Sequence, residues 1–313
     1  MEKINQAKRT LNEVIYGKEE VVDLLFIALL AEGHVLLESV PGTGKTKLAK
    51  SFSTIMGGDY SRVQFTPDVL PSDITGIRFF NPKTQEFELR LGPVVTNVLL
   101  ADEINRATPK TQSSLLEVME EAQTTIDGEK IKIDAPFIVL ATQNPIESNY
   151  GTFPLPEAQL DRFLFKIDLG YPSKDEGKSI LKNYRLADPF DELEPLLNLN
   201  EIISLQEKTR EVYVSDVVID YLLELIHNSR NSKDVELGIS PRGMLGLMRA
   251  AQSRALLSGR DYVSPNDIQV LATYVFEHRI ILSMEAAMKR TAKEVTEEII
   301  KNVTVPIEAG VNN

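Results

Sequence analysis

The sequence contains no cysteine. This absence excludes a disulfide scaffold, a zinc site with cysteine ligands and a thiol nucleophile. Positively charged residues are fewer than negatively charged ones. The chain has 34 lysine and arginine residues and 46 aspartate and glutamate residues, which gives a formal net charge of −12. The acidic balance argues against a broad basic face for duplex DNA or anionic lipid.

Long apolar runs are missing as well. The longest, residues 21–31, is interrupted by Asp23 and is far shorter than the ~20 residues that a membrane span needs. The amino-terminal segment MEKINQAKRTLNE lacks the apolar region of a secretion signal. We therefore expect a cytoplasmic protein without a membrane span, and the 313 residues allow two globular domains.

Apolar runs alternate with helical patterns in the first part of the chain. Short buried strands are predicted at residues 34–38, 62–65, 98–101, 137–141 and 163–167, and helices at 18–32, 44–56 and 109–121. This alternation predicts an α/β fold, with a parallel five-stranded sheet covered by helices. Residues 77–91 and 124–133 are predicted to form two β-hairpins, the second turning at Asp127 and Gly128.

The pattern changes near residues 187–200, which are rich in proline and acidic residues and are interpreted as a linker. Beyond it, helices are predicted at residues 214–229, 241–258, 265–278 and 284–302, with no alternation typical of strands. We expect two domains: residues 1–190, an αβα domain that carries the two hairpins, and residues 191–313, an all-helical domain.

Residues 39–46 read SVPGTGKT between a predicted strand and a predicted helix. They match the phosphate-loop pattern G-x-x-x-x-G-K-[ST] except at the first position, where Ser39 replaces glycine. In such a loop the backbone N–H groups and the positive end of the helix bind phosphate, Lys45 contacts the β- and γ-phosphates, and Thr46 binds Mg²⁺. The residues predicted to bind the nucleotide here are Ser39, Pro41, Gly42, Thr43, Gly44, Lys45 and Thr46.

Polar side chains follow two later strands. Asp102 and Glu103 end the strand at 98–101, where α/β sheets place their ligands. We expect Asp102 to coordinate Mg²⁺ and Glu103 to polarise the attacking water. Asn144 follows the strand at 137–141 and is predicted to orient that water or to contact the γ-phosphate.

Two arginines are further candidates. Arg162 lies at the C-terminus of a short helix predicted at residues 156–163, where the helix dipole favours a cation, or it acts as an arginine finger for a neighbouring subunit. Arg242 lies in the first turn of a helix that begins Ser240-Pro241, where the dipole disfavours a cation, which suggests a nearby anion, most simply the γ-phosphate.

Ile15, Tyr16 and Gly17 precede the first predicted helix. They either flank an adenine ring or simply lead into the helix.

Together these residues resemble the MoxR group of AAA+ ATPases, over nearly the whole chain. The marks of the resemblance are PGTGKT (41–46), FTPDVLPSDITG (65–76), ADEINRA (101–107), ATQNP (141–145), LPEAQLDRF (155–163) and SPRG (240–243). Ser39 departs from the glycine usual in that group. The resemblance implies an αβα core, a C-terminal helical lid and a hexameric ring.

It also implies roles for individual residues. Asn144 would be the first sensor, Arg162 the arginine finger and Arg242 the second sensor, and Arg106 would act across the subunit interface. Members of the group are chaperone-like remodellers that often work with a partner carrying a von Willebrand factor A domain.

The leading hypothesis is Mg²⁺-dependent ATP hydrolysis by a ring that remodels a protein client. Two alternatives are a nucleic-acid motor or loader and a nucleotide-gated scaffold that hardly hydrolyses ATP. The net charge of −12 and the lack of a recognised DNA-binding motif count against the first alternative. The complete set of acidic, amide and arginine residues counts against the second.

Overall fold

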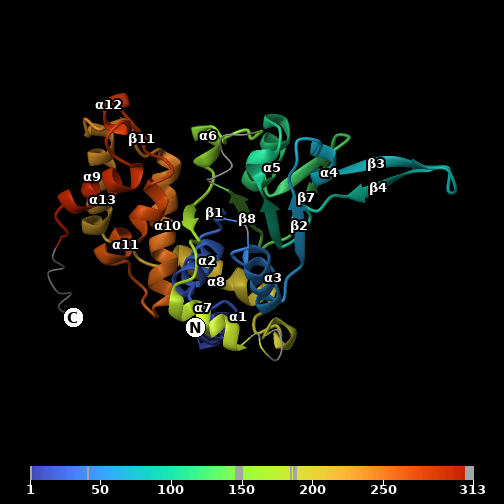
Figure 1. Cartoon of the computed structure of the whole chain (residues 1–313), viewed down its shortest axis with the longest axis horizontal. Coiled ribbons are helices and arrows are strands. Elements are labelled where there is room, and N and C mark those ends of the chain that lie inside the picture. The colour runs from blue at the N-terminus through green and yellow to red at the C-terminus, as the bar shows by residue number, and fades with distance from the viewer. Residues whose placement is uncertain (1, 41, 145–150, 184, 186–188, 307–313) are drawn as a thin grey trace.

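Five parallel strands form the centre of the molecule (Figure 1). The computed structural model describes residues 2–40, 42–144, 151–183, 185 and 189–306. The strands are β1 (Val35–Glu38), β2 (Tyr60–Gln64), β5 (Val98–Asp102), β8 (Ile138–Gln143) and β9 (Phe165–Asp168), in the spatial order β2-β5-β8-β1-β9. All neighbours pair in parallel, which confirms the predicted sheet.

Helices cover both faces of the sheet. Val35 and Leu37 of β1 belong to a hydrophobic cluster with α1 (Glu2–Val14), α2 (Glu19–Leu30) and α3 (Lys45–Met56). Leu36, which points to the opposite face, belongs to a second cluster with α5 (Pro109–Glu121). The helix α1 was not predicted, although Ile4 and Leu11 are buried at the spacing of an amphipathic helix.

Two hairpins extend from the sheet, as predicted. They are β3 (Gly76–Asn81) with β4 (Glu86–Leu91), and β6 (Gln123–Ile126) with β7 (Glu129–Lys132). Asp127 and Gly128 both have positive φ, as a tight two-residue hairpin turn requires. The β3–β4 hairpin projects away from the body at the right of Figure 1 and exposes Phe80 and Phe87.

The C-terminal part is helical, with one addition to the prediction. It contains α8 (Leu199–Glu211), α9 (Asp216–Asn231), α10 (Pro241–Leu257), α11 (Pro265–Phe276), α12 (Met284–Ala287) and α13 (Ala292–Asn302). It also contains a short antiparallel sheet of β10 (Val235–Leu237) and β11 (Ile281–Leu282), so this part is not entirely helical. These strands are too short to show alternation in the sequence.

Two further boundaries differ from the prediction. The predicted helix at 284–302 is split into α12 and α13, because Thr291 begins a new helix with a capping box to Glu294. The predicted linker at 187–200 includes η3 (Pro189–Glu192) and the start of α8, where Asn198 forms a capping box with Glu201.

The larger hydrophobic cluster continues from α1–α3 and the sheet into α8–α11. Gln206 of α8, for example, donates a buried hydrogen bond of 2.7 Å to the carbonyl oxygen of Leu29 in α2. The predicted boundary after residue 190 stays a prediction. Among the described helices, none has both the length and the apolar character needed to cross a membrane. The remaining short elements are α4 (Pro71–Thr75), η1 (Ile104–Arg106), α6 (Glu157–Leu160) and α7 (Lys174–Asn183).

Candidate active site

The loop between β1 and α3 presents an open surface at the carboxyl end of the sheet. Gly42 and Gly44 have φ values of 83° and 86°, and a Cβ atom built on either would meet nothing within 4 Å. Thr43 steadies the loop by donating a hydrogen bond of 3.1 Å to the carbonyl oxygen of Val40. Because α3 begins at Lys45, the positive end of its helix dipole adjoins this open space, which is the arrangement that binds phosphate.

Ser39 extends the pairing of β1 with β8, since its N–H donates to the carbonyl oxygen of Gln143 at 3.2 Å. Its buried hydroxyl oxygen has no hydrogen-bond partner within the described part of the chain. Thr46 lies half-buried in the first turn of α3. Pro41, also predicted to bind the nucleotide, lies outside the described residues.

Asp102 lies at the end of β5 and is held from three sides. The Nζ atom of Lys45 is 3.5 Å from its carboxylate, Thr142 of β8 donates a hydrogen bond of 2.6 Å, and Arg62 of β2 donates one of 2.6 Å. Burial alone would raise the pKa of Asp102. The hydrogen bonds from Thr142 and Arg62 and the charges of Lys45 and Arg62 outweigh burial, so this pKa lies below its usual value.

Glu103 follows directly in a left-handed backbone conformation, with φ 58° and ψ 48°. Such strain is costly for a residue other than glycine and is often found at functional sites. Its N–H donates to the hydroxyl of Thr142 at 2.9 Å, and its carboxylate accepts a hydrogen bond of 2.7 Å from Gln64. Arg106, predicted to act across an interface, here forms an ion pair of 3.2 Å with Glu103 of its own chain.

Asn144 is buried directly after β8. Because β8 lies between β5 and β1, this residue lies at the same edge of the sheet as the two acids and the phosphate loop. The fold therefore brings Lys45, Asp102, Glu103 and Asn144 together, as the sequence predicts.

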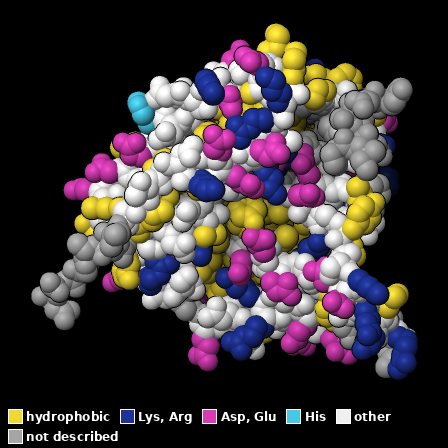
Figure 2. Space-filling view, turned by 60° about the vertical axis from the view of Figure 1, so that its left-hand side comes forward, with side chains coloured by type: hydrophobic (Ala, Val, Ile, Leu, Met, Phe, Trp, Pro, Cys, Tyr) yellow, Lys and Arg dark blue, Asp and Glu magenta, His cyan; other side chains and the backbone are white. Residues whose placement is uncertain are grey.

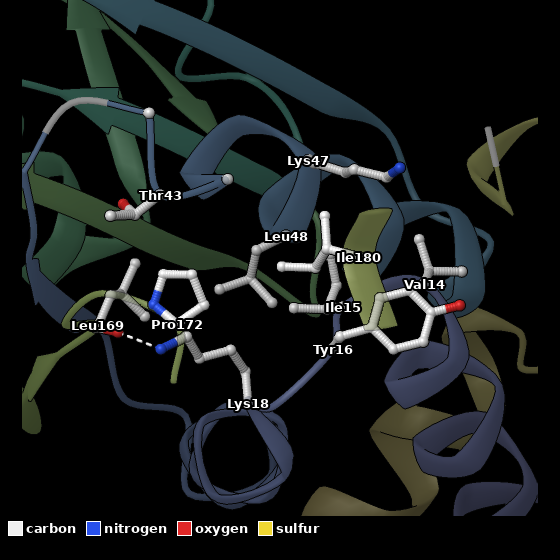
Figure 3. A pocket seen from close by; sticks show the side chains of 12 residues that line it. Val14, Ile15, Tyr16, Lys18, Thr43, Lys47, Leu48, Leu169, Pro172 and Ile180 are labelled. Carbon is white, nitrogen blue, oxygen red and sulfur yellow. Dashed lines mark hydrogen bonds between the residues drawn. The ribbon is translucent and has the colours of Figure 1, made fainter. Parts of the chain in front are cut away.

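A cavity of about 210 Å³ adjoins the phosphate loop (Figure 3). Ile15 and Tyr16 line it, which is the place that the sequence predicts for residues beside an adenine ring. Gly17 makes the turn that follows, with φ 68°, and a Cβ atom there would lie 2.1 Å from the carboxyl group of Glu176 in α7. In Figure 3, Lys18 points into the cavity toward the carbonyl oxygen of Leu169, to which it donates a hydrogen bond.

Several residues of the site were not found from the sequence. Arg62, Gln64 and Thr142 hold the two acids, and Lys18, Leu48, Leu169, Pro172 and Ile180 line the cavity. Thr142 carries a signal, since it lies in the same ATQNP segment as Asn144. The others lie on strands, helices and loops whose positions only the folded chain defines.

Arg162 and Arg242 lie together, but at the opposite edge of the sheet from the phosphate loop. Both form ion pairs with Glu120 in the last turn of α5, Arg162 at 2.9 Å. That turn contacts the amino end of β1, because the ring of His34 lies 2.9 Å from the carbonyl oxygen of Met119. The anion that the sequence suggests near Arg242 is therefore, within this chain, the carboxylate of Glu120.

The residues present fit a magnesium-bound nucleoside triphosphate. Mg²⁺ is commonly held by one or two protein oxygens together with substrate phosphates, and Asp102 and Thr46 supply such oxygens. Among the described residues, no cluster of three or more His, Cys, Asp or Glu residues that could hold a metal ion is found. The open loop beside Lys45 provides space for the phosphates.

The chain is similar to several known proteins. Residues 34–165 match the model of the ATPase family associated with various cellular activities (AAA), and residues 227–302 match the AAA lid domain. A protein of Bacillus subtilis named YeaC, described as uncharacterized, is 47% identical over 306 residues, which is 97% of this chain and 95% of that protein. The Chaperone MoxR1 of Mycobacterium tuberculosis is 42% identical over 301 residues, 93% of this chain and 78% of that protein.

A crystal structure from Cytophaga hutchinsonii, of a protein described as a candidate ATPase, is also similar. It has a TM-score of 0.91 and 36% sequence identity, and the match covers 98% of this chain and 96% of that one. The protein MoxR of Paracoccus denitrificans is 32% identical over 320 residues, with 93% of this chain and 92% of that protein covered. The chain therefore belongs to the MoxR-type AAA+ ATPases.

Proposed function

We propose that this chain binds ATP with Mg²⁺ and hydrolyses it to drive the remodelling or maturation of a protein client. The observation that carries the proposal is the meeting of Lys45, Asp102, Glu103 and Asn144 at one edge of the sheet, beside an open phosphate loop. A cavity lined by Ile15 and Tyr16 adjoins that loop and suits the adenine base.

Each residue has a defined task in this proposal. Lys45 and the N–H groups at the start of α3 bind the phosphates, and Thr46 and Asp102 hold the magnesium ion. The bound ion neutralises negative charge on the phosphates. Glu103 accepts a proton from the attacking water, and Asn144 orients that water. Thr142 fixes both acids, because its hydroxyl donates to Asp102 and accepts from the backbone of Glu103.

Arg162 and Arg242 are proposed to act on the nucleotide of a neighbouring subunit. They lie at the amino edge of the sheet, whereas the phosphate loop lies at the carboxyl edge. The four residues of β1 between the two edges span about 13 Å. A ring, with six subunits as the family resemblance implies, would bring one subunit's arginine pair to the next subunit's phosphates.

The client is proposed to be a protein or protein complex, with a von Willebrand factor A domain protein as a candidate partner. The support is the family resemblance and the printed name of the mycobacterial relative, a chaperone. A nucleic-acid motor is less well supported. On the face turned forward in Figure 2, acidic and basic side chains are intermixed, and the net charge is −12.

The variant Glu103→Gln tests the proposal. It should bind ATP with unchanged affinity and should release no phosphate in a steady-state assay, because the amide cannot accept the proton. Glu117→Gln, at an exposed position of α5, is the matched control and should hydrolyse ATP normally. Hydrolysis retained by Glu103→Gln would exclude this residue as the base. Hydrolysis too slow to measure in the unaltered protein would favour the scaffold alternative.

A further inference from the structure

Arg279 carries a buried guanidinium group between α11 and β11, and every one of its N–H directions is used. Its Nε donates to the carboxylate of Asp161 at 2.7 Å. Its Nη2 donates to the carbonyl oxygens of Asp161 and Phe163 at 3.0 and 2.6 Å, and its Nη1 to those of Leu164 and Val275 at 3.2 and 2.5 Å. One side chain thus joins the segment that precedes β9 to the helical region.

Asp161 also binds the start of α10. The hydroxyl of Ser240 lies 2.9 Å from each of its carboxylate oxygens and donates to them. The same hydroxyl accepts a hydrogen bond of 3.0 Å from the N–H of Gly243, so it caps α10 as well. Ser240 therefore fixes the first turn of α10 to the segment before β9.

Gly243 leaves room for the side chain of Arg279 beside the first turn of α10. A Cβ atom on this residue would lie 2.8 Å from the Cδ and 3.0 Å from the Nε of Arg279. A larger residue at this position of the first turn of α10 would displace the guanidinium packed against it.

The two arginines of the proposed site lie directly beside these contacts. Arg162 follows Asp161 in the chain, and Arg242 lies between Ser240 and Gly243. We infer that Asp161, Ser240, Gly243 and Arg279 form a positioning cluster that holds Arg162 and Arg242 side by side for the triphosphate of the neighbouring subunit. This inference rests on the proposed function.

The variant Arg279→Lys gives the first test. Lysine keeps the charge but cannot reproduce the planar fork, so the two arginines lose their fixed spacing. Since a displacement of about 1 Å can cost about 100-fold in rate, kcat for ATP should fall by about 100-fold. The affinity for ATP should stay within about twofold, because the variant's own phosphate loop is untouched. Turnover within about threefold of the unaltered protein would overturn the inference.

A mixing experiment separates positioning from a general structural role. Arg279→Lys subunits are mixed with Glu103→Gln subunits, which cannot hydrolyse ATP but present intact arginines. The mixture should recover turnover, because each Arg279→Lys site beside such a neighbour receives a correctly placed arginine pair. A mixture without recovery would overturn the inference, provided that the reference mixture described next does recover.

The reference mixture combines Arg162→Ala with Glu103→Gln. Its recovery establishes that the arginines act between subunits, as the proposed function requires. If the reference mixture stays inactive, the arginines do not act between subunits. That result contradicts this part of the proposed function and also the positioning role that rests on it. Failure of the Arg279→Lys mixture alone refutes only the positioning role.

A second pair of variants decides the question if Arg279→Lys does not fold, as judged by circular dichroism. Ser240→Ala removes both the helix cap and the bond to Asp161, whereas Ser215→Ala removes the corresponding cap of α9 alone. Ser240→Ala should lower kcat by at least about tenfold with ATP affinity unchanged, and Ser215→Ala should not. Equal turnover in these two variants would overturn the inference.

Discussion

His34 links the amino end of β1 to the neighbouring strand β8 and to the helix α5. Its Nδ1 accepts a hydrogen bond of 3.0 Å from the N–H of Val139, and its Nε2 lies 2.9 Å from the carbonyl oxygen of Met119. Because a backbone N–H can only donate, Nδ1 carries no proton, and the ring donates through Nε2. Burial lowers the pKa of His34 from 6.5 to about 4, although the hydrogen bond to Met119 acts in the opposite direction.

The pKa of His34 therefore differs between the folded and the unfolded chain, and this difference makes the free energy of unfolding depend on pH. Between pH 6.5 and about pH 4 the imidazole takes up a proton in the unfolded chain but not in the folded one. The folded state therefore loses stability as the pH falls through this window. With these two pKa values, the free energy of unfolding should fall by about 2 kcal/mol between about pH 7 and pH 5 on account of His34.

Urea unfolding of the unaltered protein and of the variants His34→Gln and His227→Gln, at these two pH values, measures the effect. His34→Gln keeps an amide donor and acceptor but has no group that titrates, so its loss of stability should be about 2 kcal/mol smaller than that of the unaltered protein. His227→Gln, at an exposed position of α9, should behave like the unaltered protein. Burial also lowers the pKa of His278. Because this residue is present in all three proteins, it affects their free energies of unfolding equally. An equal loss in His34→Gln and the unaltered protein would refute this reasoning.

Two further predictions concern buried hydrogen-bonded groups. Asp267→Asn should lower the free energy of unfolding by about 3 kcal/mol in urea titrations, because its fully buried carboxylate pairs with Arg254 and with Arg260 at 2.7 Å. The exposed Asp216→Asn is its control, and an equal effect in both would contradict the prediction. Thr142→Val should lower kcat at least about tenfold with little change in ATP affinity measured without Mg²⁺, because both acids lose the hydroxyl that fixes them. Weaker ATP binding at unchanged kcat would contradict it.

The sequence predicts the carboxyl edge of the sheet well because the relevant residues are local in the chain. Lys45 and Thr46 lie in one short motif, and Asp102 and Glu103 end one apolar run. Parallel strands then bring these segments together without further information, since their carboxyl ends share one edge. The expected positions of the strands and of both hairpins follow from the same local patterns.

The amino edge could not be predicted in this way. Arg279 lies more than 100 residues beyond Asp161 in the chain, and no local pattern joins them. The dipole argument for Arg242 indicates an anion but cannot identify Glu120. The helices α1 and α8 were missed for a different reason, because their signals, a buried apolar spacing and the capping box at Asn198, are present in the sequence.

The hydrophobic cluster shared by α1–α3 and α8–α11 determines how easily the helical region can move relative to the sheet. Swinging the helical region away from the sheet would bring leucines such as Leu25 and Leu247 into water, at about 1.5–3 kcal/mol for each fully exposed side chain. Each such side chain adds to the free energy that a hinge motion within the chain would cost. In the ring proposed above, each turnover should therefore shift whole subunits against one another rather than open a hinge within one of them.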